Sequence, residues 1–302
     1  MRLYGTLSSI AVPCFFMLSG AFTLADDRNE NYAYFYSKCM KNVGIQTIIF
    51  SVLYFLYSEA LIVLGIVVKG KEWSRLWIPI EDFVKGKPYY HMWYLYTLAG
   101  LYLLVPIILK IKNSVKEETF KKICIALFLV ASISGRTSSF VLHWCITKVV
   151  CYLRYFTAGY QLRKWGEKKN NKVGSLFIIL GVIGFIGIAV TDNIECGGHF
   201  CLGTIILSLF IFAGFSKVTM TINLDKLASK TLYIYLIHAF VWNLLSRVVR
   251  RIGVEVEAGI MIPIFVFLVF GVSYVLSVIY VKLWNSIDKK FLVSKKACKI
   301  FE

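Results

Sequence analysis

Long apolar runs separated by short polar stretches fill the chain from one end to the other. Nine of these runs reach about 18 residues with few charges, the length that a helix needs to cross a bilayer. They cover residues 4–24, 43–68, 91–110, 122–141, 144–161, 173–190, 200–216, 231–250 and 259–281. The pattern predicts an all-α fold, a polytopic helical bundle integral to the membrane with about nine transmembrane helices.

Little sequence remains outside these runs. Nine spans of about 20 residues take about 180 residues, so residues 1–302 are expected to form a single integral-membrane domain with short loops. The composition agrees, because 58% of the residues are hydrophobic and only 17% are charged. It excludes a disordered chain, a collagen and a disulfide-stapled secreted fold.

Basic residues are distributed unequally between alternate loops. The segments on one side hold 22 Lys and Arg, and those on the other side hold 11. The positive-inside rule then places the C-terminus in the cytoplasm and Met1 outside. The net charge of +17 is attributed to orientation and anionic lipid, and no nucleic acid partner is expected. An odd span count with an outer start predicts either that a very short N-terminus is translocated or that the chain lacks its first helix.

Three polar residues inside predicted spans are candidates for chemistry, because ionisable groups are costly in a membrane. Arg154, His238 and Ser19 lie about 10, 12 and 8 Å from the cytoplasmic ends of their helices, at 1.5 Å per residue. This shared depth makes them the predicted catalytic residues. Each has an alternative: Arg154 could snorkel to lipid headgroups, His238 could bond a backbone carbonyl, and Ser19 could serve close packing beside Gly20.

A histidine and several aromatic residues mark the outer end of the span 91–110. His91, Trp93 and Tyr96 suit an aqueous mouth that holds a sugar-like acceptor, and His91 could act as a base near neutral pH. Anchoring at the membrane interface explains the aromatic residues equally well. For the outer loop 69–90, which carries Trp73 and Trp77, the interfacial belt is favoured over a binding surface.

The outer loop 191–199 and the start of the next span contain two cysteines close in sequence. Cys196 and Cys201 could form a disulfide, and together with His199 they could ligate zinc. The zinc match is weak, because the spacing fits poorly and only three ligands are present. No metal cofactor is therefore expected.

Three segments together resemble the membrane acyltransferase-3 family, which includes O-acetyltransferases of bacterial cell-surface polysaccharides. Residues 13–20, Pro-Cys-Phe-Phe-Met-Leu-Ser-Gly, are similar to its Pro-x-Phe-Phe-x-x-Ser-Gly helix. Residues 91–95, His-Met-Trp-Tyr-Leu, resemble its His-x-Trp-[Phe/Tyr]-Leu span. Residues 231–238 resemble its late Tyr-x-Leu-His helix, so the resemblance spreads over nearly the whole chain.

The resemblance implies a helical membrane enzyme that moves an acyl group, usually acetyl from cytoplasmic acetyl-CoA, to a hydroxyl of a carbohydrate or related acceptor. The richness in Lys and Arg and the short loops suit a bacterial plasma membrane. Lys38 and Lys41 correspond to the family's basic pair, usually arginine, and would attract the CoA phosphates. The family's candidate catalytic histidine lies on a helix upstream of the first motif, and no histidine precedes that motif here. The predicted substrate-binding residues are His91, Trp93, Tyr96 and Tyr235.

Two other functions compete with acyl transfer. A non-enzymatic exporter or carrier of a polysaccharide intermediate could use the same aromatic mouth and polar interior. Transporters often show internal repeats, which this sequence does not clearly show. The other alternative is an inactive, N-terminally short homologue.

Overall fold

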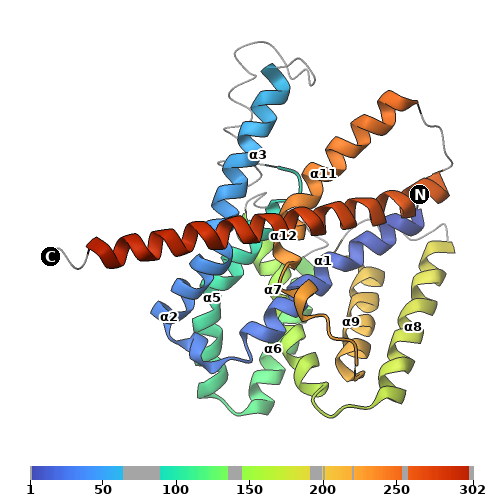
Figure 1. Cartoon of the computed structure of the whole chain (residues 1–302). Coiled ribbons are helices and arrows are strands. Elements are labelled where there is room, and N and C mark those ends of the chain that lie inside the picture. Colours follow the sequence, from blue (N-terminus) through green and yellow to red (C-terminus); the bar gives the residue numbers. More distant parts are fainter. Residues whose placement is uncertain are drawn as a thin grey trace. The chain divides into compact units, whose positions relative to one another are not determined.

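The computed structural model describes residues 2–63, 89–134, 145–190, 199, 201–219, 221–253 and 258–298. Every regular element in these ranges is helical, which confirms the predicted all-α fold. The chain divides into two compact units, Met1–Met220 and Thr221–Glu302. Each unit is described by itself (Figure 1).

The long helices of unit 1 follow the predicted spans. They are α1 (Arg2–Thr23), α3 (Ile45–Val63), α5 (Trp93–Ser114), α6 (Glu117–Ser134), α7 (Cys145–Trp165), α8 (Asn171–Val190) and α9 (Leu202–Lys217). Three short elements join α1 to α3: η1 (Asp27–Glu30), α2 (Tyr32–Cys39) and the π-helix η2 (Met40–Gly44). Unit 2 holds α10 (Asp225–Ala228), α11 (Thr231–Ile252) and α12 (Ala258–Cys298), and α11 packs against α12.

Helices occur at all nine predicted spans, but four stretches in the described residues are long and apolar enough to cross a membrane. These stretches are Tyr32–Leu61, Trp93–Ser114, Thr231–Ile252 and Gly259–Ile287. Three further apolar stretches are shorter: Ser8–Thr23, Asn171–Gly187 and Leu202–Lys217. The chain is thus a multi-pass membrane protein, and the count of nine spans stays a prediction.

α7 is the inner helix of unit 1. It packs against α1, α5, α6 and α9, and its side chains Tyr152, Arg154 and Thr157 are at most 2% exposed. A helix that other helices shield from lipid can carry polar side chains, because its neighbours can solvate them. This explains why α7 is missing from the apolar stretches although it lies at a predicted span.

The helix that carries the first motif crosses α7 with the two backbones in contact. A Cβ atom added at Gly20 would collide with the carbonyl oxygen of Phe156, and one added at Gly159 would collide with that of Met17. Small residues of this kind allow two membrane helices to approach closely. Gly20 of the Ser-Gly motif therefore allows α1 and α7 to pack closely.

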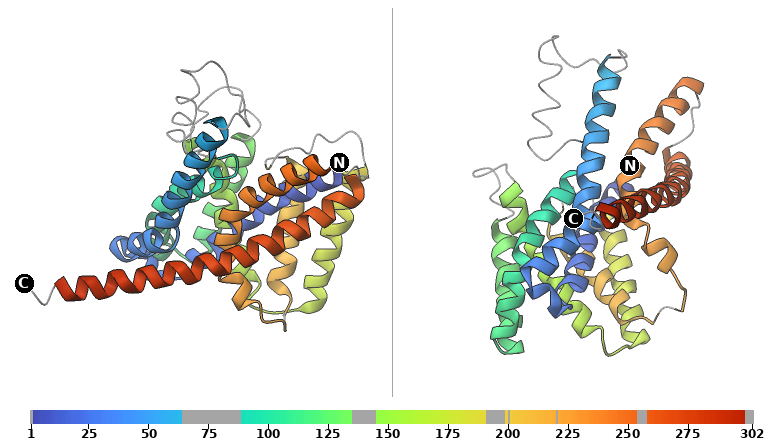
Figure 2. Two further views of the ribbon diagram at one scale, coloured as in Figure 1. Left: turned by 45° about the horizontal axis from the view of Figure 1, so that its top comes forward. Right: turned by 60° about the vertical axis from the view of Figure 1, so that its left-hand side comes forward.

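α8 and α9 lie side by side as an antiparallel pair in every view (Figures 1 and 2). A Cβ atom at Gly174, near the start of α8, would lie 2.9 Å from the carbonyl oxygen of Gly214, near the end of α9. At the other end of the pair, Gly184 lies against Leu207. This pairing fixes the turn before α9, which carries a residue of the candidate site.

Candidate functional site

Arg154, a predicted catalytic residue, is enclosed in the middle of α7. Its exposed fraction is 0%, and its guanidinium carbon lies 4.9 Å from the centre of the Tyr155 ring, a cation–π contact. Such complete burial argues against the alternative in which Arg154 snorkels to the lipid surface. Its catalytic role stays a prediction.

Ser19, on α1, has its polar partners on α5. Its side chain interacts with the hydroxyl groups of Tyr94 and Tyr102. Arg154 lies on α7, and a joint catalytic role of Ser19 and Arg154 stays a prediction.

His238 and Tyr235 belong to unit 2. The Nδ1 atom of His238 lies 2.6 Å from the carbonyl oxygen of Tyr235 in the same helix, and the centres of the two rings are 5.5 Å apart. This geometry matches the alternative of a histidine bonded to a backbone carbonyl. Ser19 and Arg154 lie in unit 1, and a catalytic role of His238 together with them stays a prediction.

The predicted acceptor residues at the start of α5 have different neighbours. His91 is buried, with its ring centre 5.1 Å from that of Tyr54 on α3. The hydroxyl groups of Tyr96 and Ser51 are 3.0 Å apart, which again links α5 to α3. Trp93 instead contacts α7 and the turn before α9. His91 and Tyr96 therefore lie against α3, whereas Trp93 lies against α7 and the turn before α9.

A group of residues that we name the outer cluster surrounds the imidazole of His199. It consists of Ser9, Trp93, Lys148, Tyr152 and His199 itself. The Nδ1 atom of His199 lies 3.0 Å from the carbonyl oxygen of Ser9 on α1. Its ring centre lies 5.9 Å from that of Trp93 and 6.2 Å from that of Tyr152. The Lys148 amine lies 4.8 Å from the centre of the Trp93 ring.

The backbone and the charge state of His199 are also constrained. The Tyr155 hydroxyl donates a hydrogen bond to the His199 carbonyl oxygen at 2.5 Å. Burial lowers the pKa of His199 below its ordinary value of 6.5, and the charge of Lys148 acts in the same direction, while the bond to Ser9 opposes it. Near neutral pH, His199 is therefore an uncharged, oriented imidazole.

Sequence reasoning considered His199 only as a zinc ligand. Its partner Ser9 is 190 residues away in the chain, so no local pattern could reveal the outer cluster. The proposed disulfide or zinc partner Cys196 lies outside the described residues, and these two hypotheses are not tested. Trp73 and Trp77 of the loop 69–90 also lie outside the described residues.

The opposite end of unit 1 is basic, and several of its cations already have partners. The Lys38 amine lies 3.2 Å from a carboxylate oxygen of Asp26. Arg28 donates two hydrogen bonds to the same carboxylate, at 2.8 and 3.0 Å, and holds the pKa of Asp26 well below its usual range, with Lys38 assisting. Of the two predicted CoA contacts, Lys38 is thus paired, whereas Lys41 is exposed.

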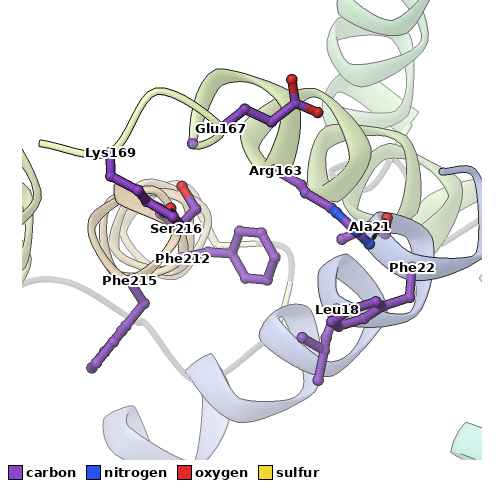
Figure 3. Close-up of a pocket in the computed structure, with 10 residues that line it drawn as sticks. Leu18, Ala21, Phe22, Arg163, Glu167, Lys169, Phe212, Phe215 and Ser216 are labelled. Carbon is purple, nitrogen blue, oxygen red and sulfur yellow. Dashed lines mark hydrogen bonds between the residues drawn. The ribbon is translucent and has the colours of Figure 1, made fainter. Parts of the chain in front are cut away.

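A pocket of about 420 Å³ opens at this basic end between α1, α7 and α9 (Figure 3). Arg163 reaches from α7 to α1, where its Nη1 atom donates to the carbonyl oxygen of Ala21 at 3.0 Å. Phe212 points into the space between α9 and α1. The Lys169 amine donates to the carbonyl oxygen of Ser216 at 2.6 Å. The pocket therefore combines two cations and one carboxylate, that of Glu167, with largely apolar walls.

A family model described as an acyltransferase domain, that of the acyltransferase-3 family, matches residues 1–282. This match extends across both compact units and covers nearly all of the chain. The chain therefore belongs to the acyltransferase-3 family of membrane acyltransferases. Comparisons with curated proteins and with solved structures returned no match.

Proposed function

We propose that this membrane acyltransferase transfers an acyl group, acetyl in the simplest case, from acyl-CoA on the cytoplasmic side to a hydroxyl of a cell-surface carbohydrate. The fully buried Arg154 carries this proposal. Acyl transfer passes through a tetrahedral oxyanion, and fixed charges in a site that excludes water stabilise such an anion strongly. A buried cation on the inner helix of the bundle is suited to that task.

The basic end of unit 1 supports a CoA donor. The cations of the pocket, Arg163 and Lys169, match phosphate groups, and its apolar walls match the less polar pantetheine arm. Exposed Lys41 adds positive charge at the same end. Lys38 is expected to contribute less, because Asp26 neutralises it. The positive-inside rule supports a cytoplasmic location for this end.

The end of unit 1 that holds the outer cluster supports a sugar-like acceptor. Aromatic side chains gather there with a few polar groups, which is typical of a site for a small ligand. Trp93 contributes to the outer cluster, while His91 and Tyr96 lie toward α3. The proposed roles of His238 and Tyr235 rest on the family motif.

Replacement of Arg154 tests the proposed function. The full chain is purified into lipid vesicles, and transfer of radiolabelled acetyl from acetyl-CoA to an envelope glycan fraction is measured. Because Arg154→Gln removes the charge, kcat is expected to fall roughly 100- to 1,000-fold. Arg251→Gln, at an exposed position of α11, is the control and should keep wild-type activity. If the wild-type chain labels no glycan fraction, the proposed function is wrong.

Replacement of Arg163 tests the donor end. Arg163→Gln should raise the KM for acetyl-CoA roughly tenfold, equivalent to about 1.4 kcal/mol, with little change in kcat. Arg163→Lys keeps the charge and should have a smaller effect. Lys121→Gln, at an exposed position of α6 outside this pocket, is the matched control. An unchanged KM in Arg163→Gln would exclude this pocket as the donor site.

A further inference from the structure

We infer that the outer cluster is the acceptor site of this enzyme. In this site a carbohydrate ring stacks on Trp93, which is partly exposed, and the Nε2 atom of His199 removes the proton from the reacting hydroxyl. The inference rests on the proposed function and assigns its acceptor chemistry to residues of α5, α7 and the turn before α9.

The hydrogen bond to Ser9 determines which nitrogen of His199 can act as a base. A carbonyl oxygen only accepts hydrogen bonds, so the Nδ1 atom 3.0 Å from it must carry the proton. In the neutral imidazole the Nε2 atom then has a free lone pair. A base whose other nitrogen is held by a fixed acceptor is the arrangement that general-base catalysis requires.

The Trp93 ring beside His199 provides a surface for a sugar. The ring centres of Trp93 and Tyr152 are 5.7 Å apart, and both lie about 6 Å from the imidazole. Tyr152 is only 2% exposed and Phe16 of α1 stacks on it at 4.4 Å, so Tyr152 supports the Trp93 ring and does not itself contact the sugar. Rigid aromatic rings contribute a large contact area to the apolar face of a sugar, while nearby polar groups orient its hydroxyls.

The reaction balances without a further reactant. The pantetheine arm extends from the donor pocket along α7 and brings the thioester to the outer cluster. There the acceptor oxygen attacks the carbonyl carbon of the thioester as its proton passes to Nε2 of His199, so that a carbon–oxygen bond forms. The carbon–sulfur bond then breaks, and the leaving thiolate takes the proton from the imidazolium. The products are an ester and free CoA, and His199 returns to its neutral form.

The charged and titratable groups around His199 favour the neutral base. Burial and the positive charge of Lys148 keep the pKa of His199 below 6.5, although the bond to the Ser9 carbonyl opposes them. The other titratable groups that face it are Tyr152 and Tyr155 on α7, with Cys201 two residues further along its own turn. α1 and α5 present the Ser9 carbonyl and the Trp93 ring, which do not titrate in this range.

His199→Gln tests the base. The full chain in vesicles is assayed for acetyl transfer to the glycan fraction that the wild type labels, and CoA binding is measured separately with radiolabelled CoA. Transfer should fall roughly 100- to 10,000-fold, while CoA binding stays at the wild-type level. Leu202→Ala, at an exposed position three residues away, is the control. Unchanged transfer would overturn the inference, and so would a parallel loss of CoA binding, which would indicate a structural role.

Two further measurements separate chemistry from packing. In the wild type, kcat/KM should fall tenfold per pH unit below the pKa of His199, and the residual rate of His199→Gln should lack this dependence.

The second measurement concerns sugar binding. Trp93→Ala should raise the KM for the glycan roughly tenfold and leave the KM for acetyl-CoA unchanged. A variant profile that keeps the wild-type pH dependence, or an unchanged glycan KM, would contradict the assignment. A wild type that labels no glycan would instead refute the proposed function itself.

Discussion

Asp26 organises the turn that follows α1. Its carboxylate accepts hydrogen bonds from Arg28 and Lys38. Next to it, the Lys112 amine contacts the carboxylate of Asp27 at 2.6 Å and the carbonyl oxygen of Leu24 at 3.0 Å. These contacts tie the end of α1 to α2 and α5. The turn thus depends on ionised carboxylates.

The stability of this turn is expected to depend on pH. The folded protein lowers the pKa of Asp26 below its ordinary value of 3.8, so Asp26 stabilises the fold above that value and loses this effect as the pH falls further. Thermal unfolding in detergent should show that Asp26→Asn is less stable than the wild type at pH 7. The two midpoints should converge below pH 3.8. A difference that stays constant with pH would contradict this explanation.

Individual residues also show how far the sequence could predict the candidate site. Arg154 stood out because an arginine within a span is rare, and its burial agrees with that expectation. His199 did not stand out, since its significance depends on a carbonyl group 190 residues away. Lys38 matched a family position, but its pairing with Asp26 depends on how the chain folds back after α1.

At the scale of helices, the crossing of α1 and α7 is the most constrained contact of unit 1. Gly20→Ala should destabilise the protein by about 1–3 kcal/mol, the usual cost of overpacking, because the new methyl group meets a backbone carbonyl that cannot rotate away. Gly271→Ala on α12, where a Cβ atom would meet nothing within 4 Å, is the matched control. Unfolding midpoints of the two variants in the same detergent check this prediction, and equal midpoints would refute it.

Hydropathy predicted the positions of the helices well and their ends less well. The predicted span 259–281 continues as helix to Cys298, because lysine and other long side chains favour helix without being apolar. α7 was predicted as a span although it carries Lys148 and Arg154. Its packing against four other helices shields these residues from lipid, which a window average cannot represent.

At the scale of the whole molecule, the distribution of basic residues gives a topology that can be measured. In a variant without the eight native cysteines, Tyr90→Cys should react with a membrane-impermeant maleimide on intact cells. Lys116→Cys, between α5 and α6, should react only after permeabilisation. The opposite labelling pattern would reverse the orientation, and with it the assignment of the donor and acceptor ends.

The crossing of α1 and α7 also has a consequence for biosynthesis. Ala21 and Arg163, which meet beside this crossing, are 142 residues apart, so α1 enters the membrane long before α7 has been translated. During this interval the glycine surface of α1 must rest against lipid or the insertion machinery. The outer cluster is complete only after the turn before α9 has been made, which makes its assembly a late step in the maturation of the enzyme.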